Sequence, residues 1–463
     1  MKLALDLDKA LSSGVKSLRD TTDTSMMEWK NLLTRQRLGK DTEDDPVIAR
    51  TSFQRDCDRL VFSFPFRRLK DKTQVFSLSK NDYIRTRLIH SIEVSCVGRS
   101  LGTFVGYEIK NRYKLNDFSA SDFGDIVSAA CLAHDIGNPP FGHAGEDAIR
   151  SGFKSWYGSV KVPLSDSETT DFDLFEGNAQ GFRILTRLEM RARVGGMQLT
   201  CPTLAAFTKY PRESLIPSSV LNGYAGKSAS KYGFFQSEKD LFAAVAEAVG
   251  LIRRHSDFAW WVRHPLTFLV EAADDICYQI VDLEDGFRMG YIPFSTTKEL
   301  LNEIAQHSNL EQQIESEEET IKFLRGIVIN SLIEEVARIF LEYEPDMLAG
   351  KFDRELLSLS TYTNSLKEIQ NETQNKVFID PDIIGMQLAG YEVLGTLFSE
   401  FANAVLFPSS KGRLLKGMLP QKYRPSDDES CYNKLLKVTD YISGMTDSYA
   451  TSLFQQLRGI SLK

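Results

Sequence analysis

The sequence has no long hydrophobic run, and this absence excludes an integral membrane protein. No apolar stretch approaches the roughly 18 residues that a membrane-spanning helix requires. The first residues, MKLALDLDKALSSG, hold only a short apolar stretch interrupted by aspartates, which is not typical of a signal peptide. We therefore expect a cytoplasmic protein that does not enter a membrane.

Paired cysteines are also missing. The six cysteines stand singly, at positions 57, 96, 131, 201, 277 and 431, and no two have the CxxC spacing. This distribution argues against a zinc ribbon and against a framework of disulfides. Isolated cysteines fit the reducing environment of the cytoplasm.

The sequence contains little that resembles a β-sheet. One short possible strand lies near 74–78, and no alternation of strands and helices follows it. Apolar residues instead recur at spacings of three and four, which is typical of amphipathic helices. These segments predict an all-α fold and cover 82–101, 122–134, 238–252, 263–283, 320–345 and 383–406.

Charge is low overall but uneven along the chain. The formal net charge of −8 disfavours broad, non-specific binding to nucleic acid. Residues 50–87 nevertheless hold ten Lys and Arg against four Asp, a surplus of six positive charges. Such a surplus fits either a focused site for a small polyanion or a solvated basic face, and charge alone does not separate the two.

Composition suggests three regions. We expect a helical N-terminal arm (1–49), a helical core (50–290) and a large C-terminal helical region (291–463). Within the core, 151–171 is polar and rich in Ser and Gly, and 211–233 is rich in Pro, Gly and Ser. Both segments are predicted to be surface insertions, the second a mobile loop over a site.

The segment SAACLAHDIGNPPFGHAGEDAI (128–149) carries the clearest chemical signal. A predicted helix delivers His134 and Asp135 and then stops at Gly137 and the following Pro139-Pro140 pair. Adjacent His and Asp side chains at a helix end can direct two kinds of ligand at one cation. The pair alone is a weak signal, and a metal site needs further donors on other helices.

Two further donors lie on otherwise apolar helical segments. His90 is part of NDYIRTRLIHSIEVSCVG, and Asp274 is part of PLTFLVEAADDICYQIVDLEDG. A polar group on an apolar face is either a ligand or a costly buried group that needs a partner. For His90 taken by itself, a satisfied core histidine is the simpler interpretation.

The order His…His-Asp…Asp resembles the signature of the HD phosphohydrolases. The surrounding blocks resemble the bacterial dGTP triphosphohydrolases in particular, in the same order, from residue 50 to about 448. They are RTSFQRDCDRL, FRRLKDKTQVF, RTRLIHSIEV, CLAHDIGNPPFGHAGE, LFEGNAQGFRIL, KYGFF followed by SE, EAADDICYQIVDLEDG and DYISGMTD. The resemblance implies an HD-domain helical core and a C-terminal region that completes the pocket.

The resemblance implies four metal ligands: His90, His134, Asp135 and Asp274. Spacing supports Asp274 over its neighbour, because Asp274, Tyr278 and Asp282 stand at i, i+4 and i+8 on one helix face. Asp275 would point roughly 100° away. Two imidazoles and two carboxylates suit one divalent cation, with Mn²⁺ or Mg²⁺ expected first and Fe²⁺, Co²⁺ or Zn²⁺ also compatible.

His143 and Glu146 are the expected catalytic pair. They stand three residues apart at the start of the next helix, and the resemblance places them beside the α-phosphate. The ordinary pKa of histidine suits proton transfer near neutrality, and a glutamate can orient the ring or a water molecule. The sequence leaves open whether His143 serves as acid or as base.

The remaining site residues follow from the resemblance and from the needs of a triphosphate. Arg87 lies one turn before His90, and Lys209 and Lys231 flank the 211–233 insertion. Tyr278 would close the space beside sugar C2′ and so exclude a ribose. The other expected substrate contacts are Asn178 near the phosphates, Gln74 and Asp282 near the sugar hydroxyl, and Glu392 and Arg424 near the base.

The expected reaction is hydrolysis of dGTP to deoxyguanosine and inorganic triphosphate, through attack of water on the α-phosphorus. A homo-oligomer, either a tetramer or a hexamer, is expected to form through the C-terminal region, and single-stranded nucleic acid is a candidate effector. Two alternatives stay open. One is a different HD hydrolase, such as a 5′-nucleotidase or cyclic-nucleotide phosphodiesterase, and the other is a non-catalytic sensor of nucleotides or single-stranded nucleic acid.

Overall fold

We describe the protein from a computed structural model, which covers residues 26–44, 49–74, 85–221, 223–306 and 316–461. The described residues form no β-sheet, and their only strand-like pairings are isolated bridges such as Thr73 with Thr86. The all-α prediction is confirmed. Most of the possible strand at 74–78 and most of the N-terminal arm lie outside the described residues.

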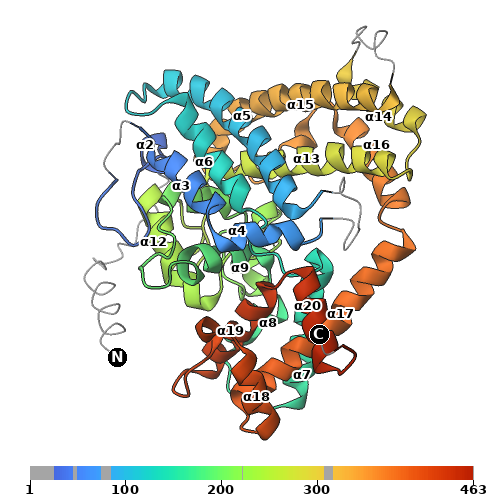
Figure 1. The fold of residues 1–463 in the computed structure, drawn as a ribbon. Coiled ribbons are helices and arrows are strands. Elements are labelled where there is room, and N and C mark those ends of the chain that lie inside the picture. Colours follow the sequence, from blue (N-terminus) through green and yellow to red (C-terminus); the bar gives the residue numbers. More distant parts are fainter. Residues whose placement is uncertain (1–25, 45–48, 75–84, 222, 307–315, 462–463) are drawn as a thin grey trace.

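Helices α2 to α10 form the first half of the chain (Figure 1). Several begin at side chains that accept a hydrogen bond from the first helical turn. Thr51, Ser119 and Ser165 form such caps, each reciprocated by the residue three positions later. The bounds are α2 Trp29–Leu32, α3 Ser52–Val61, α4 Phe64–Arg68, α5 Arg87–Tyr113, α6 Ala120–Ala133, α7 Gly142–Ser159, α8 Asp166–Asp173, α9 Gly177–Arg183 and α10 Cys201–Phe207, with short turns at Leu69–Asp71 and Ile184–Leu188.

The second half continues with long helices. Proline occupies the first position of α13 and α17, where its missing N–H has no helical partner to lose. The bounds are α11 Ser218–Leu221, α12 Lys239–Val249, α13 Pro265–Arg288, α14 Phe294–Ala305, α15 Glu317–Leu348, α16 Thr363–Lys376, α17 Pro381–Leu406, α18 Ser410–Met418, α19 Cys431–Ser443 and α20 Asp447–Leu457, with short turns at Lys227–Ala229, Gln236–Glu238, Leu357–Leu359 and Gln421–Tyr423. The six predicted helical segments correspond to α5, α6, α12, α13, α15 and α17.

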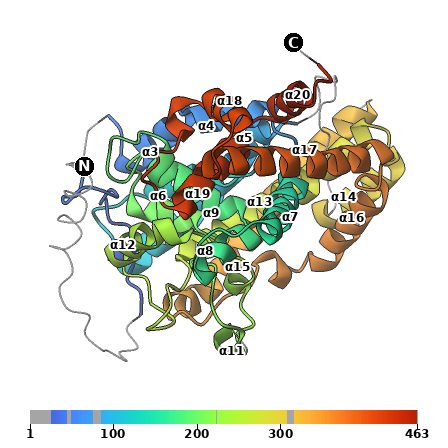
Figure 2. The same cartoon turned by 90° about the horizontal axis from the view of Figure 1, so that it is seen from below.

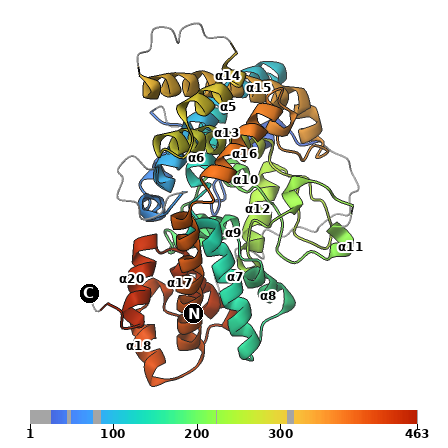
Figure 3. The same cartoon turned by 90° about the vertical axis from the view of Figure 1, so that its right-hand side faces the viewer.

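Two hydrophobic cores divide the protein differently from the predicted regions. The larger core joins α5, α6, α10 and α13 to α14, α15 and α16. The smaller core joins α7 and α8 to α17, α19 and α20, which lie together in the lower part of Figure 1 and of Figure 3. The C-terminal region therefore contributes to both cores, and the boundaries proposed at 49/50 and 290/291 stay predictions.

Residues 151–171, expected as a surface insertion, are largely helical and contribute to the smaller core. They include the second half of α7 and part of α8, and Phe153 and Trp156 of α7 are buried there. Figure 2 shows α7 running beside α17. The polar residues of this segment lie on the outer face of these helices, which is why the sequence resembled a surface insertion.

The 211–233 segment carries α11 and lies at the surface in Figure 3. Its ends are buried, and Asp353 accepts hydrogen bonds from Tyr224 and from the backbone and hydroxyl of Ser228. Those contacts anchor the segment to the chain that follows α15.

Candidate active site

Helix ends and one long helix bring the predicted donors into a single cavity of about 490 Å³. His90 comes from the first turns of α5, His134 and Asp135 follow the end of α6, and Asp274 lies in the middle of α13. Twelve of the fifteen predicted site residues line this cavity, and Asn138, Tyr210 and Asp275 line it as well. The twelve are Gln74, Arg87, His90, His134, Asp135, His143, Glu146, Asn178, Lys209, Lys231, Asp274 and Tyr278.

Three of the four predicted metal donors form a compact group. One ligand atom each from His90, His134 and Asp274 lies within 4.8 Å of the other two. His134 Nδ1 is 2.7 Å from the carbonyl of Cys131, which can only accept, so Nδ1 carries the proton and Nε2 presents a lone pair. That Nε2 atom is buried and makes no hydrogen bond within the described residues. An imidazole in this tautomer, with an unpartnered nitrogen among carboxylates, fits a metal ligand.

Asp274 is the negative centre of this group. Its Oδ1 lies 3.1 Å from His90 Nε2, and its Oδ2 lies 2.7 Å from Lys209 Nζ. Burial by itself would raise the pKa of Asp274, but the Lys209 ammonium and the two imidazoles hold that pKa well below its usual range. Asp274 is therefore ionised, as a metal ligand must be.

Asp135 lies at the edge of the group. Its Oδ1 is 3.5 Å from His134 Nε2 and accepts from Asn138 at 2.5 Å, while its Oδ2 accepts from Arg87 at 2.6 Å. Although burial raises its pKa, Arg87 and His134 bring the pKa below the ordinary range. Arg87 thus lies on the metal side of α5, as its spacing from His90 predicts.

His143 and Glu146 form a hydrogen-bonded pair at the start of α7. His143 Nδ1 is 3.0 Å from Glu146 Oε2, and the other oxygen of Glu146 accepts from the backbone N–H of Gly177 at 2.6 Å. Burial raises the pKa of Glu146, but the hydrogen bond and charge of His143 and the charge of Lys231 lower it overall. An ionised Glu146 only accepts, so Nδ1 donates and the exposed Nε2 remains available for a proton.

Two glycines allow this close packing. A Cβ on Gly177 would lie 2.4 Å from Asn138 Oδ1 and 2.8 Å from Glu146 Oε1. Gly142 has a φ of +59°, and a Cβ there would lie 2.5 Å from a terminal nitrogen of Arg87. Both positions bring backbone against side chains that line the cavity, where only glycine fits without displacement.

Basic side chains surround the cavity. Lys231 Nζ lies 3.1 Å from Glu176 Oε2, and although burial lowers its pKa, Glu146 and Glu176 raise the pKa overall. Lys209 behaves in the same way, since Asp274 outweighs burial and raises its pKa. Of the described Lys and Arg residues in 50–87, only Arg87 lines the cavity. The surplus of positive charge in that range is therefore mostly used elsewhere, for example by Arg59 and Arg68, which donate to backbone carbonyls.

The far end of the cavity is apolar and aromatic. The rings of Tyr278 and Phe378 stack with centroids 6.2 Å apart, and Ile383, Met386 and Gln387 of α17 complete this wall. Gln74 lines the cavity, and its Oε1 has no hydrogen-bond partner among the described residues. Asp282 is buried one turn beyond Tyr278, outside the lining. Its Oδ2 also lacks a partner in the described part of the chain, and burial raises its pKa to about 8.

Glu392 and Arg424 do not line this cavity. Arg424 donates to the carbonyls of Leu419 and Gly417, and Glu392 lies exposed on α17 near Arg458. Sequence reasoning instead missed Phe378 and Gln387. The Asp380-Pro381 pair, which begins α17, was the available signal, because a helix that starts there places its first turns against the cavity.

Comparison with known proteins agrees with this site. An HD domain model matches residues 87–168, and a phosphohydrolase-associated domain model matches residues 359–456. A deoxyguanosinetriphosphate triphosphohydrolase-like protein of Synechocystis sp. is 60% identical over 94% of this chain and 100% of its own length. One of Pseudomonas aeruginosa is 40% identical over 94% of this chain and 99% of its own length.

A deoxyguanosinetriphosphate triphosphohydrolase of Klebsiella pneumoniae is 30% identical over 88% of this chain and 94% of its own length. No helix among the described residues is long and apolar enough to cross a membrane. The HD domain implies a bound divalent metal, for which the residues around His134 are suited. The chain is thus a hydrolase and belongs to the deoxyguanosinetriphosphate triphosphohydrolase family of the HD-domain phosphohydrolases.

Proposed function

We propose that this protein hydrolyses deoxynucleoside triphosphates, with dGTP preferred, to the deoxynucleoside and inorganic triphosphate. One observation carries the proposal: the donor group around His134 and the His143–Glu146 pair line the same cavity, and basic side chains surround both. Metal-dependent hydrolases use a group of metal ligands beside a pair of residues that can transfer a proton. Three basic residues, Arg87, Lys209 and Lys231, also line the cavity. Three positive side chains are more than a phosphate monoester requires, and they suit a triphosphate.

His90, His134, Asp135 and Asp274 would hold the divalent cation, with Mn²⁺ or Mg²⁺ the first candidates. Two neutral imidazoles and two carboxylates balance its charge. When bound, the cation would lower the pKa of a water molecule and offset charge on the α-phosphate. Asp135 shares its oxygens with Arg87 and Asn138, so those two residues orient this carboxylate.

His143 would move the proton. With Glu146 fixing Nδ1 as a donor, Nε2 faces the solvent side of the cavity, and 82% of the His143 side chain is exposed. A substrate that fills the cavity would cover this ring and place its α-phosphate beside Nε2. The direction of the transfer, from water or to the leaving 5′-oxygen, is left to measurement.

Lys209, Lys231 and Arg87 would bind the phosphate oxygens, with Asn178 contributing an amide. The Lys209 ammonium lies 2.7 Å from Asp274, and the Lys231 ammonium lies 3.1 Å from Glu176. A triphosphate could compete with these carboxylates for both ammonium groups. Charge-assisted hydrogen bonds of this kind are strongest where water is excluded. They would also offset the charge that develops in the transition state.

The stacked pair of Tyr278 and Phe378 would bind the sugar and base. Tyr278 lies one turn beyond the metal donor Asp274, so its ring would reach the sugar when the α-phosphate is at the metal. Gln74 and Asp282 each offer an oxygen that has no partner among the residues the structure describes and could accept from the 3′-hydroxyl. Gln387 and Met386 of α17 stand at the base end and replace Glu392 and Arg424 in this role.

The test is product analysis. Purified protein with Mn²⁺ is given each of the four deoxynucleoside triphosphates, and the products are separated by chromatography. We expect nucleoside and intact triphosphate, fastest with dGTP. Release of monophosphate or of free phosphate would instead identify another HD hydrolase, and binding without turnover would identify a sensor.

A further inference from the structure

A buried carboxylate outside the cavity ties together two of its walls. Asp447, the first residue of α20, is 1% exposed. Its Oδ1 accepts from the backbone N–H of Phe141 at 3.1 Å. Its Oδ2 accepts from the backbone N–H of Thr73 at 3.0 Å and from the Thr73 hydroxyl.

We propose that Asp447 is a positioning residue for the reaction, holding His143 and Gln74 at the correct separation across the cavity. The inference rests on the proposed function, because it concerns the placement of the groups assigned there. It assigns a role in the active site to the C-terminal unit of α17, α19 and α20, which shares the smaller hydrophobic core with α7 and α8.

The turn that Asp447 holds is one that the backbone does not favour. Phe141 has a φ of +63°, and the next residue, Gly142, also has a positive φ. A bulky residue in this conformation is strained and persists only where its surroundings impose it. Phe141 is the N-cap of α7, so the orientation of this turn sets the position of His143 two residues later.

Two contacts impose the turn. Gly390 of α17 accommodates the Phe141 ring, since a Cβ there would lie only 3.0 Å from it. Asp447 accepts the Phe141 N–H, which has no partner within the helix and lies at the positive end of α7. Both come from the C-terminal unit.

Asp447 also holds the second wall of the cavity, which contains Thr73 and Gln74. Thr73 precedes Gln74, and the carbonyl of Lys72 accepts from the backbone N–H of Arg87 at the start of α5. Lys72 is buried, and its Nζ donates to the carbonyls of Asn138 at 2.5 Å and Ser443 at 2.8 Å. The Lys72–Thr73 segment, the turn before α7 and the start of α20 therefore meet at one junction.

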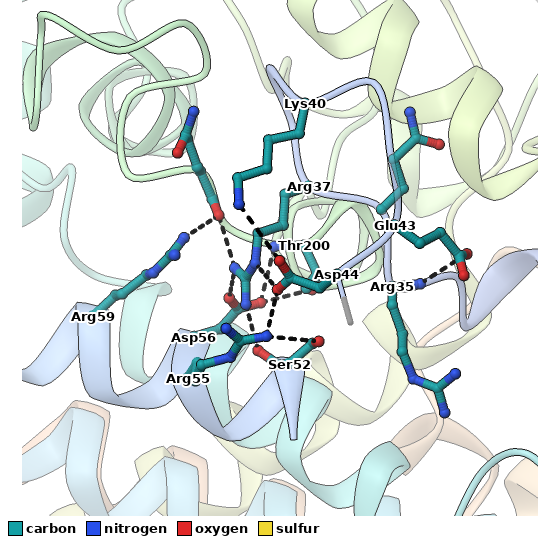
Figure 4. A network of polar contacts seen from close by, with 12 residues as sticks. Arg35, Arg37, Lys40, Glu43, Asp44, Ser52, Arg55, Asp56, Arg59 and Thr200 are labelled. Atoms are coloured by element: carbon teal, nitrogen blue, oxygen red, sulfur yellow. Dashed lines mark hydrogen bonds and ion pairs between the residues drawn. The ribbon is translucent and has the colours of Figure 1, made fainter. Parts of the chain in front are cut away.

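A matched control exists elsewhere in the chain. Asp56 is fully buried and accepts from both the backbone N–H and the hydroxyl of Thr200, at 2.9 and 2.6 Å, the same arrangement that Asp447 makes with Thr73. Figure 4 shows Asp56 and Thr200 in a polar network around Arg37. None of these residues lines the cavity.

The experiment compares Asp447→Asn with Asp56→Asn in the full-length, metal-loaded protein. An asparagine keeps the shape but presents N–H groups where the carboxylate accepted. We expect Asp447→Asn to lower kcat by about 10- to 100-fold, the range for residues that support a metal site, with KM and manganese affinity changed by less than about 3-fold. Asp56→Asn should lower the melting temperature and leave the kcat of the folded protein unchanged.

A second pair of variants, with smaller expected effects on folding, is used if either asparagine variant fails to fold. Thr73→Val and Thr200→Val each remove one hydroxyl donor, and only the first should lower kcat. Amide hydrogen exchange at Phe141, measured without substrate, should be faster in Asp447→Asn than in the wild type. An unchanged kcat with unchanged exchange would overturn the inference, and so would an equal loss of kcat in the control.

The wild type separates this inference from the function on which it rests. If the wild type releases no triphosphate, the proposed function fails, and the exchange at Phe141 still reports whether Asp447 holds the turn. If the wild type is active and Asp447→Asn matches it, only the inference fails.

Discussion

Two buried clusters of charge in this protein differ in whether their polar atoms are satisfied. In the Arg37 cluster, made of Arg37, Asp44, Asp56 and Thr200, the guanidinium is fully buried and every nitrogen has an acceptor. The cluster joins the segment before α3 to the start of α10, as Figure 4 shows. It is a closed arrangement in which each nitrogen of the Arg37 guanidinium already donates to the protein itself.

The cavity holds comparable charges in an open arrangement. His134 Nε2, Gln74 Oε1 and Arg87 Nε are buried there without a hydrogen-bond partner among the described residues. An unsatisfied buried polar group costs about 1–3 kcal/mol, so these positions are expensive unless a ligand completes them. The difference indicates that the Arg37 cluster serves folding, whereas the cavity is organised for a metal and a substrate.

The largest expected effect comes from removing a metal donor. Asp274→Asn and His134→Ala should lose bound manganese and reduce activity to background, because each removes a ligand. Asp274→Asn should also lower the free energy of unfolding of the metal-free protein, because the buried Lys209 ammonium loses its carboxylate partner, so loss of metal distinguishes this cluster. Metal content and urea unfolding of the same preparations give both results, and a variant that keeps metal and turnover would show that the site is wrongly placed.

In the Arg37 cluster we expect a substitution to reduce stability without any loss of bound metal. Asp56→Asn should lower the unfolding free energy by about 3–5 kcal/mol, because it leaves the buried Arg37 charge without its main partner. Manganese binding and kcat per folded molecule should not change. A variant with unaltered stability but reduced kcat would reverse the distinction between the two clusters.

A smaller effect on turnover is expected from the proton-transfer pair. His143→Ala should keep metal and substrate binding and lower kcat by roughly 100-fold, the usual contribution of a general acid or base. Glu146→Ala should act in the same direction, and the double variant should cost less than the product of the two, because the residues act together. Strict multiplicativity, or full activity in His143→Ala, would assign the proton to another group.

The smallest effect should come from the carboxylate next to the metal donor. Asp275→Asn should change manganese affinity by less than about 10-fold, below the range for groups that support a metal. Asp275 lies outside the donor group of His90, His134 and Asp274, and burial and the charges of Glu271 and Asp274 raise its pKa well above the usual range, which favours the uncharged form that asparagine imitates. If Asp275→Asn loses manganese and Asp274→Asn retains it, Asp275 is the metal ligand and Asp274 is not.

Much of the cavity was predictable from local pattern. Helical spacing placed Asp274 and Tyr278 on one face, and the helix end at Gly137 predicted that His134 and Asp135 would point at one site. These features depend on residues close together in sequence, where helix geometry fixes direction. The metal, catalytic and phosphate assignments themselves stay predictions until the variants are measured, as does the expected oligomer.

The C-terminal side of the cavity was less predictable. Gln387 reaches the cavity because α17 packs along α7, and no local pattern reports that long-range contact. Glu392 lies on the same helix but faces elsewhere, so a shift of a few residues separates a base contact from an exposed carboxylate. The partner of Arg37 was equally hidden, since Asp56 is 19 positions away in sequence and the RTSFQRDCDRL block that contains it does not indicate which residue it pairs with.

Manganese titration of the metal-stripped, full-length protein by calorimetry tests the contrast between the two clusters most directly. The account predicts a single ion per chain in the wild type and in Asp56→Asn, and none in Asp274→Asn. Manganese binding that survives in Asp274→Asn, or that disappears in Asp56→Asn, would contradict it.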